Sequence, residues 1–451
     1  MPEITEIDRV VIASTMQRAR IPGVSVAYFD GKTHTLSTTT IGITDKHATP
    51  AEGPVRPDTV FCAASLSKPV FAYLVLKLID KGMLSRSGES AASGLDRPLH
   101  EILPLENFFR AHGKELSAED IERAKAITPR MLLSHTSGLG IDDSAALSFK
   151  PGREFAYSGM GLMYLQNVIK QVTDQSLETL AQNNVFQPLG MLHSSFLPPD
   201  RPGYMAQTIS SHAKSKETPK TPNAANSVHT TASDYAKLMT AWMRDPSPIM
   251  KQAFVPQINL TQDNQKLPGE SEPAAKDVPE EDKARLAWGL GLGLELDKTG
   301  EAAKAFHTGD MNQYRSQVAL NLKDKSCIVY FANGRDHREA NGHILGPLII
   351  SPKIPVPHAH TWFYEKFRFA KSVDELIGGP HFGLRSPKPK KADSYAVMAA
   401  MMPKRTPAPE PSPHETRKKS DVESSHEKID EEERQEETNR PASPSPFKMT
   451  P

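Results

Sequence analysis

Cysteine is scarce in this sequence, and long apolar runs are missing. The only two cysteines, Cys62 and Cys327, cannot form a framework of disulfides, which indicates a reducing compartment. No uncharged apolar run approaches the roughly 20 residues that a membrane-spanning helix needs, so no membrane span is expected. The start of the chain, MPEITEIDRVVIAS, carries acids early and lacks the basic start and apolar core of a secretory signal. These absences predict a cytoplasmic location.

A net charge is missing too, because lysine and arginine total 54 and aspartate and glutamate also total 54. Without an overall field to attract nucleic acid or an anionic membrane, neither partner is predicted. Hydrophobic residues make up only 38% of the chain, and the polar excess lies in residues 386–451. That segment is crowded with proline, serine, lysine and glutamate, and buries too little apolar surface to offset its ordering entropy. We predict one folded domain over 1–385 and a disordered tail over 386–451.

Strand signals lie near both ends of the predicted domain. Val24–Asp30 is typical of a strand, and Asp30-Gly31 predicts a hairpin turn into a returning strand over 34–41. Further strands are expected at 60–63, 289–296, 316–322 and 326–332, and helices at 115–126, 128–135, 160–172, 176–184 and 231–243. This order predicts an α+β fold: an antiparallel sheet, closed by both ends of the domain and flanked by helices, with an all-helical lobe inserted over roughly 85–280.

The stretch FCAASLSKPVFAYLVLKL, residues 61–78, places Ser65 and Lys68 at the head of an apolar run. Proline is tolerated in the first turn of a helix but costs about 3 kcal/mol or more in its interior. Pro69 therefore predicts that the helix begins no more than about one turn earlier, with Ser65 at its N-terminus. At that position the backbone N–H of Ser65 is available to a substrate oxyanion. Gly82 is the expected stop signal.

Lys68 lies three residues after Ser65, on the same face of the predicted helix. A lysine can take the proton of a serine only if it is neutral, which costs roughly 4–5 kcal/mol at pH 7 from the reference pKa. Burial and a nearby helix N-terminus both lower that cost. The spacing alone is not specific, because Ser-x-x-Lys recurs at 211–214, 425–428 and 445–448, although no apolar helix follows there.

Four stretches extend this pattern along the chain: AASLSKPV (63–70), ITPRMLLSHTSGL (127–139), PGREFAYSGMGLMYLQNVI (151–169) and FHTGDM (306–311). In this order they resemble the serine beta-lactamase-like superfamily. The likeness is to its branch of class C beta-lactamases, esterases and D-aminopeptidases, which are penicillin-binding-protein-like serine hydrolases. The resemblance spans roughly residues 10–350 and implies a beta-lactamase/transpeptidase-like fold.

The resemblance also implies roles for particular residues. Ser65 would be the acylated nucleophile, Lys68 its general base or proton relay, and Tyr157 the partner that exchanges a proton with Ser65 or with the leaving group. Lys68 and Tyr157 are best treated as one coupled pair with no fixed proton owner. The oxyanion would lie between the N–H groups of Ser65 and Asp310. The remaining substrate-binding residues would be His307, Thr308, Gly309 and, in compensation for the neutral His307, Arg315.

Two residues depart from the family's pattern. Gly159 stands where an asparagine usually follows the tyrosine, so a side-chain amide that contacts substrate is missing. His307 stands where the third motif often has lysine, and a histidine is mostly neutral at pH 7. Both departures favour an esterase or a peptidase-like amidase over a proficient beta-lactamase.

We therefore predict a serine hydrolase that hydrolyses a small ester or amide through an acyl-enzyme on Ser65. A beta-lactamase or D-Ala carboxypeptidase is the first alternative. The second is an inactive scaffold whose tail recruits protein partners; the Glu-rich end of that tail also resembles export signals on some bacterial effectors. Tyr157 could be a packed aromatic and His307 a core histidine, and we interpret His135 as structural. No cofactor or metal is predicted, since His-Glu-x-x-His is absent.

Overall fold

The computed structural model describes residues 6–19, 21–44, 53–140, 144–199, 221–260, 284–311, 314–334 and 345–356. All of them belong to one compact unit, Met1–Met402. The predicted tail at 386–451 lies outside the described residues.

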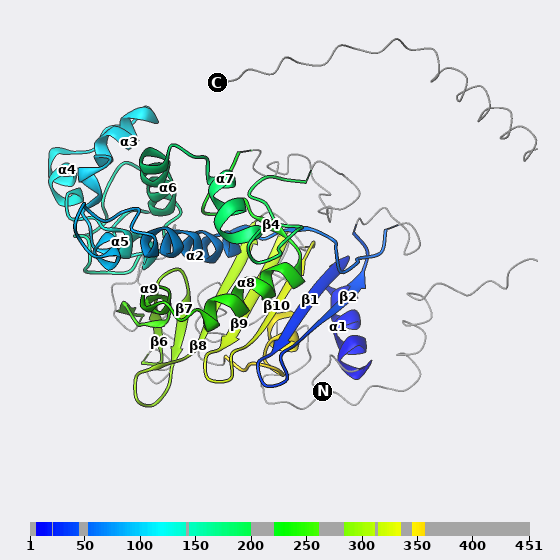
Figure 1. The fold of residues 1–451 in the computed structure, drawn as a ribbon. Coiled ribbons are helices and arrows are strands. Elements are labelled where there is room, and N and C mark those ends of the chain that lie inside the picture. Colours follow the sequence, from blue (N-terminus) through cyan, green and yellow to red (C-terminus); the bar gives the residue numbers. More distant parts are fainter. Residues whose placement is uncertain are drawn as a thin grey trace, which may run out of the picture. The chain divides into compact units, whose positions relative to one another are not determined.

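An antiparallel sheet runs through this unit (Figure 1). Its strands follow the order β2-β1-β10-β9-β8-β7-β6-β5. They are β1 (Gly23–Asp30), β2 (Thr35–Gly42), β5 (Ile258–Asn259), β6 (Leu286–Trp288), β7 (Gly293–Leu296), β8 (Ala302–Met311), β9 (Tyr314–Asn321) and β10 (Ser326–Ala332). The predicted hairpin joins β1 to β2, and β1 also pairs with β10 in the register Val24↔Ala332. The sheet is therefore closed by the two ends of the domain, as predicted.

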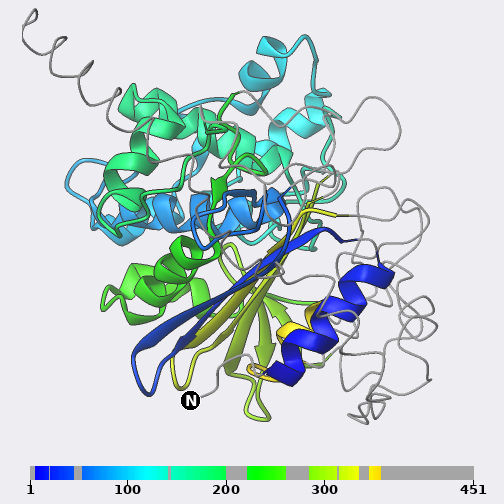
Figure 2. The same cartoon turned by 90° about the vertical axis from the view of Figure 1, so that its right-hand side faces the viewer.

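The two faces of the sheet build two separate cores. Side chains alternate along each strand, so Cys327, Val329 and Phe331 of β10 face one core, and Ile328 and Tyr330 face the other. Helix α8 (Ala232–Arg244) covers the first face, and helices α1 (Glu6–Arg18) and α11 (Leu345–Ile349) cover the second, as Figures 1 and 2 show. Burial on both faces explains why β10, with the sequence SCIVYFA, is apolar along most of its length.

The inserted helices form a lobe beyond helix α2 (Ser67–Asp80) (Figure 1). They are α3 (Leu105–Ala111), α4 (Ala118–Ala124), α5 (Pro129–Leu133), α6 (Met160–Thr173) and α7 (Leu177–Ala181), and α9 (Pro248–Lys251) follows α8. Helices α5 and α8 are capped by Thr128 and Thr231, whose side chains accept hydrogen bonds from first-turn N–H groups. Helix α4 begins three residues later than predicted, since Ser117 caps it.

Two sequence predictions need correction, and one helix was missed. Only the second half of the predicted strand 289–296 is a strand, β7, because Gly291 adopts a φ of +86° in the turn that joins β6 to β7. A Cβ on Gly291 would lie 2.3 Å from the Cβ of Ala72, so only glycine allows this turn to approach α2. The predicted strand at 60–63 is β3 (Phe61–Cys62), which pairs with β4 (His229–Thr230) apart from the main sheet. Helix α1 was not predicted.

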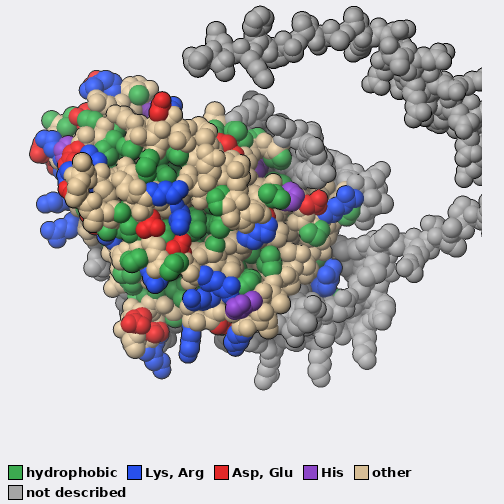
Figure 3. All heavy atoms as spheres, viewed as in Figure 1, with side chains coloured by type: hydrophobic (Ala, Val, Ile, Leu, Met, Phe, Trp, Pro, Cys, Tyr) green, Lys and Arg blue, Asp and Glu red, His purple; other side chains and the backbone are tan. Residues whose placement is uncertain are grey.

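Lysine and arginine side chains are interspersed with aspartate and glutamate over the face drawn in Figure 3. That distribution agrees with the balanced composition of the chain. Among the residues that the structure describes, no helix is both long enough and apolar enough to cross a membrane.

Candidate active site

Ser65 lies in a short 3-10 turn, Ala64–Leu66, that leads directly into α2. The expected α-helix therefore begins two residues later than Ser65, at Ser67, and Pro69 lies within its first turn. Ala64 has a φ of +51°, a conformation that a residue with a Cβ rarely adopts outside strained functional segments. The turn is fixed by Ser67, whose Oγ donates to the carbonyl of Ala64 at 2.6 Å and accepts from the N–H of Val228 at 2.9 Å.

Lys68 is buried one helical turn deeper, with 4% of its surface exposed. Its Nζ donates to the Oγ of Ser65 at 3.0 Å and to the carbonyl oxygen of Ala225 at 2.8 Å. Burial lowers the pKa of Lys68 from its ordinary value of 10.5 to about 7, and no charge partner contributes to that pKa shift. The amine is therefore available in its neutral form near pH 7.

Tyr157 precedes α6 and completes the group that the sequence predicts. The Nζ of Lys68 lies 4.8 Å from the centroid of its ring, and the Ser65 hydroxyl is near enough to the phenol to influence its pKa. Burial raises the pKa of Tyr157 well above its ordinary value, although the Ser65 hydroxyl opposes the shift. The structure thus brings Ser65, Lys68 and Tyr157 together.

The opposite pKa shifts of the two partners separate their roles. Near pH 7 the phenol of Tyr157 keeps its proton, whereas a substantial fraction of the Lys68 amine is neutral and able to accept one. Lys68 is thus suited to be the base that accepts the Ser65 proton, and Tyr157 to be the group that donates one.

Strand β8 carries the predicted third motif past the Ser65 turn. A Cβ on Gly309 would lie 2.6 Å from the carbonyl oxygen of Ala63 and 3.3 Å from the Cβ of Ala64, so glycine is what allows this approach. Ser316 of β9 fixes the same turn by donating to the carbonyl of Ala63 at 2.9 Å. Thr308 is partly exposed and Asp310 is exposed.

His307 is buried beside Tyr157, at 6.1 Å between ring centroids. Its Nδ1 lies 2.8 Å from the carbonyl of Thr308, which can only accept, so Nδ1 carries the proton. Burial, and then the positive charge of Lys68, lower the pKa of His307 to about 3. Arg315 is fully buried, and its Nη1 lies 2.7 Å from the Asp310 carboxylate. Because Arg315 is fully buried, its guanidinium is not exposed to a substrate carboxylate.

Gly159, the departure from the usual asparagine, is the residue that precedes the first turn of α6 and is buried. It supplies no side-chain amide there. In the described part of the chain, no group of three or more histidine, cysteine, aspartate or glutamate side chains could hold a metal ion.

Sequence reasoning missed two features around these residues. The first is the Ala225 carbonyl that binds Lys68, because a backbone acceptor from a distant segment leaves no mark on residue type. The second is the set of rings around Tyr157. The ring of His135 lies 4.6 Å from that of Tyr157, and the ring of Trp288 lies 6.1 Å from it, both between centroids. The sequence singled out His135, but only as a residue of the scaffold.

Comparison with known proteins places this geometry in context. The family model described as Beta-lactamase matches residues 9–345. Esterase EstB of Burkholderia gladioli is 31% identical over 188 residues, which are 35% of this chain and 42% of that protein. Penicillin-binding protein 4 of Amycolatopsis lactamdurans is 28% identical over 198 residues, 40% of this chain and 45% of that protein. The chain thus spans less than half the length of each of these two curated relatives.

The structure is similar to that of a penicillin binding protein from Bacillus halodurans, with a TM-score of 0.54 and 19% sequence identity. The match covers 72% of this chain and 95% of that one. This likeness, together with the antiparallel sheet and its helices, confirms the predicted α+β fold of the beta-lactamase/transpeptidase type.

Proposed function

Because this chain belongs to the beta-lactamase family, we propose that it is a serine hydrolase that forms an acyl-enzyme on Ser65. The observation that carries the proposal is the buried amine of Lys68, 3.0 Å from the Oγ of Ser65 and with a pKa lowered to about 7. A neutral amine at hydrogen-bonding distance is what a serine hydroxyl needs in order to attack a carbonyl at neutral pH.

The chemistry follows from these positions. Lys68 takes the proton of Ser65 while Oγ attacks the ester carbonyl and forms a tetrahedral oxyanion. The carbon–oxygen bond to the leaving group then breaks, Tyr157 donates its proton to the departing oxygen, and Lys68 returns a proton to Tyr157. Water attacks the acyl-enzyme in the second half-reaction, which releases the acid and restores Ser65.

The N–H groups of Ser65 and Asp310 are the proposed donors to the oxyanion. The approach of Gly309 to Ala63 and Ala64 supports this proposal, since it brings β8 alongside the turn that carries Ser65. Two backbone donors fixed before the reaction stabilise the negative charge without reorganisation.

The proposed substrate is a neutral carboxylic ester or small amide rather than a compound with a carboxylate. His307 is neutral, Arg315 is occupied by Asp310, and Gly159 offers no amide. A carboxylate-bearing beta-lactam or D-Ala peptide therefore lacks the cation and the amide that would orient it. Turnover of such substrates is the second candidate function, since two of the similar proteins are penicillin-binding proteins by name.

The test is a substrate panel read together with intact-protein mass spectrometry. The turnover of a p-nitrophenyl ester, of nitrocefin and of a D-Ala-D-Ala peptide is measured for the wild-type chain and for Ser65→Ala. We expect the ester to dominate, with an acyl adduct on Ser65 that the alanine variant lacks. Dominant nitrocefin or peptide turnover would favour the second candidate, and no adduct with any acylating probe would contradict the hydrolase proposal. The roles of the tail and the cytoplasmic location stay predictions.

A further inference from the structure

His135 is hydrogen-bonded to both sequence neighbours of Tyr157. The N–H of Ala156 donates to the carbonyl oxygen of His135 at 2.9 Å, and the N–H of Ser158 donates to its Nδ1 at 3.1 Å. One residue therefore accepts from the backbone on both sides of Tyr157. The Ser158 hydrogen bond fixes the peptide plane that follows the Cα of Tyr157, and the Ala156 hydrogen bond fixes the peptide one residue earlier. Together they restrict the direction in which the Tyr157 side chain leaves the backbone.

The side chain of His135 also contacts the phenol ring itself. Their planes are tilted by 44° at 4.6 Å between centroids, and His135 is only 1% exposed. On its other sides the imidazole meets Trp288 at 5.4 Å and Phe155 at 5.9 Å. The imidazole is thus held among aromatic rings, and it restrains Tyr157 from one side.

The imidazole can do this only in its neutral form. Burial, and then the charges of Lys68 and His307, lower the pKa of His135 well below its ordinary value. Because Nδ1 accepts the N–H of Ser158, the ring proton is on Nε2. A cationic ring would lose the Ser158 hydrogen bond and would repel the protonated form of Lys68.

The residue type fits the backbone as well. His135 has a φ of +58°, a region in which asparagine, aspartate and histidine are enriched among residues other than glycine. Asparagine would keep an acceptor at a similar distance from the backbone, but it would remove the ring. Among these residue types, histidine alone combines tolerance of this conformation, a neutral acceptor and a flat ring.

We propose that His135 is a positioning residue for Tyr157, which holds the phenol beside Lys68 and Ser65. The inference rests on the proposed function, in which Tyr157 donates a proton to the leaving group. Loss of the ring or of the acceptor lets the phenol leave that geometry. A displacement of about 1 Å at a reacting group lowers a rate by up to about 10²-fold.

The experiment measures the single-turnover rate of Ser65 acylation by an alkyl ester. His135→Asn and His135→Gly are compared, each alone and combined with Tyr157→Phe. Rates are expressed per site that a fluorophosphonate probe labels, so that unfolded protein does not lower them. We expect losses of about tenfold for His135→Asn and about 10²-fold for His135→Gly, with substrate affinity nearly unchanged. In the Tyr157→Phe background, His135→Asn should lower the rate by less than about twofold. His135 acts through the Tyr157 hydroxyl, and that hydroxyl is already absent.

His229→Asn is the matched control, since His229 is likewise buried and has a pKa lowered to about 4 by burial. It should lower the melting temperature and leave the acylation rate unchanged. Equal fold-losses with and without Tyr157→Phe, or a His135 variant that loses stability alone, would overturn the inference. A Tyr157→Phe enzyme that acylates at the wild-type rate would instead overturn the proposed role of Tyr157 and the inference with it.

Discussion

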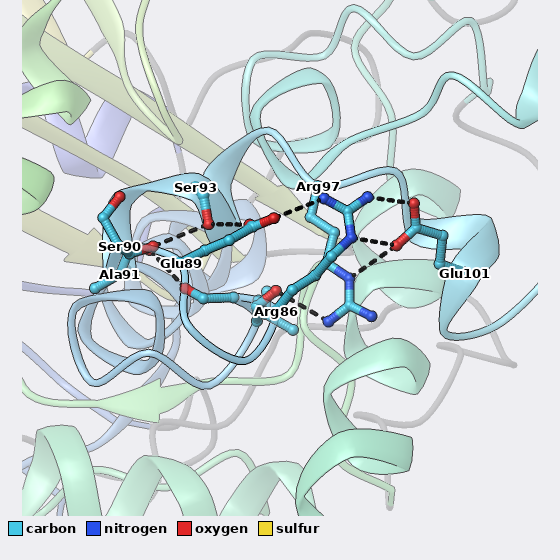
Figure 4. Close-up of polar contacts among 9 residues, drawn as sticks. Arg86, Glu89, Ser90, Ala91, Ser93, Arg97 and Glu101 are labelled. Carbon is cyan, nitrogen blue, oxygen red and sulfur yellow. Dashed lines mark hydrogen bonds and ion pairs between the residues drawn. The ribbon is translucent and has the colours of Figure 1, made fainter.

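Charged side chains lie in two different environments in this molecule, a partly exposed network of ion pairs and a buried site. In the segment that follows α2, Arg86 lies 2.5 Å from Glu101 and 3.1 Å from Glu89, and Arg97 lies 3.2 Å from Glu101 (Figure 4). These side chains are partly exposed, and the hydrogen bond from Arg86 lowers the pKa of Glu101. Lys68 is instead buried against a hydroxyl, a carbonyl and a ring, and its pKa falls to about 7.

The difference lies in what compensates each charge. Water and opposite charges satisfy the surface network, so each ion pair contributes little to stability. At Lys68 no carboxylate among the described residues compensates the ammonium, so the neutral form, which the proposed base requires, is favoured. Burial without a counter-charge, rather than the number of charges, separates the reactive region from the inert one.

The largest difference between the two regions is expected when one serine hydroxyl is removed from each region. Ser65→Ala should lower ester turnover by about 10³-fold or more, because no other group takes over the attack. Ser93 donates to Glu89 within the surface network at 2.7 Å, so Ser93→Ala is a matched control that should leave turnover unchanged. Steady-state kinetics on both variants tests this. Comparable losses would remove the distinction between the regions.

Lys68→Met should lower turnover almost as strongly, by about 10²- to 10⁴-fold, because the base is lost. The same change should raise the free energy of unfolding by roughly 1–4 kcal/mol, a range typical when buried charged groups are replaced by apolar ones. Denaturant unfolding measures this. A Lys68→Met protein less stable than wild type would show that the site does not hold a destabilised amine.

The pH dependence of stability sharpens this test. Above about 7 the folded chain releases the Lys68 proton, while the unfolded chain keeps it up to about 10.5. The unfolded state therefore binds more protons in that window, and the Lys68 contribution makes the free energy of unfolding rise with pH. Lys68→Met should remove this rise, which unfolding curves at several pH values would detect.

Tyr157→Phe should lower turnover of alkyl esters by about 10²-fold, since these leaving groups need a proton. The leaving group of a p-nitrophenyl ester departs as an anion and needs no proton. Tyr157→Phe should therefore lower the turnover of this ester clearly less. The two rates are compared under single-turnover conditions. Equal losses for both esters would exclude the phenol as the donor to the leaving group.

The smallest effect is expected at the surface. Arg86→Ala should change the melting temperature by less than about 2 °C, and salt should shrink even that difference. Turnover should stay at the wild-type level. Calorimetry at low and high salt checks this, and a large shift would mean that the network is more than a solvated set of ion pairs.

The sequence predicted the parts of the fold and site that residue type controls locally. Pro69 required a helix start near Ser65, and the predicted helices at 128–135 and 231–243 correspond to α5 and α8. The position of Tyr157 beside Ser65 came from motif order and not from local chemistry.

The rest depends on contacts between distant segments. The Ala225 carbonyl at Lys68 and the His135 contacts to Tyr157 involve backbone atoms or ring packing, which residue type does not encode. Helix α1 is stabilised by burial of Ile12 and Met16 against the sheet, a tertiary effect that its own sequence barely signals.

The account rests most on Lys68 as a neutral base for Ser65, which the pH dependence of acylation tests directly. Intact-protein mass spectrometry follows covalent labelling by a fluorophosphonate probe between about pH 5 and pH 9. We predict one adduct, on Ser65, whose rate of formation rises with a midpoint near 7 as Lys68 loses its proton. Labelling at another residue, or a rate on Ser65 that does not change with pH, would contradict the account.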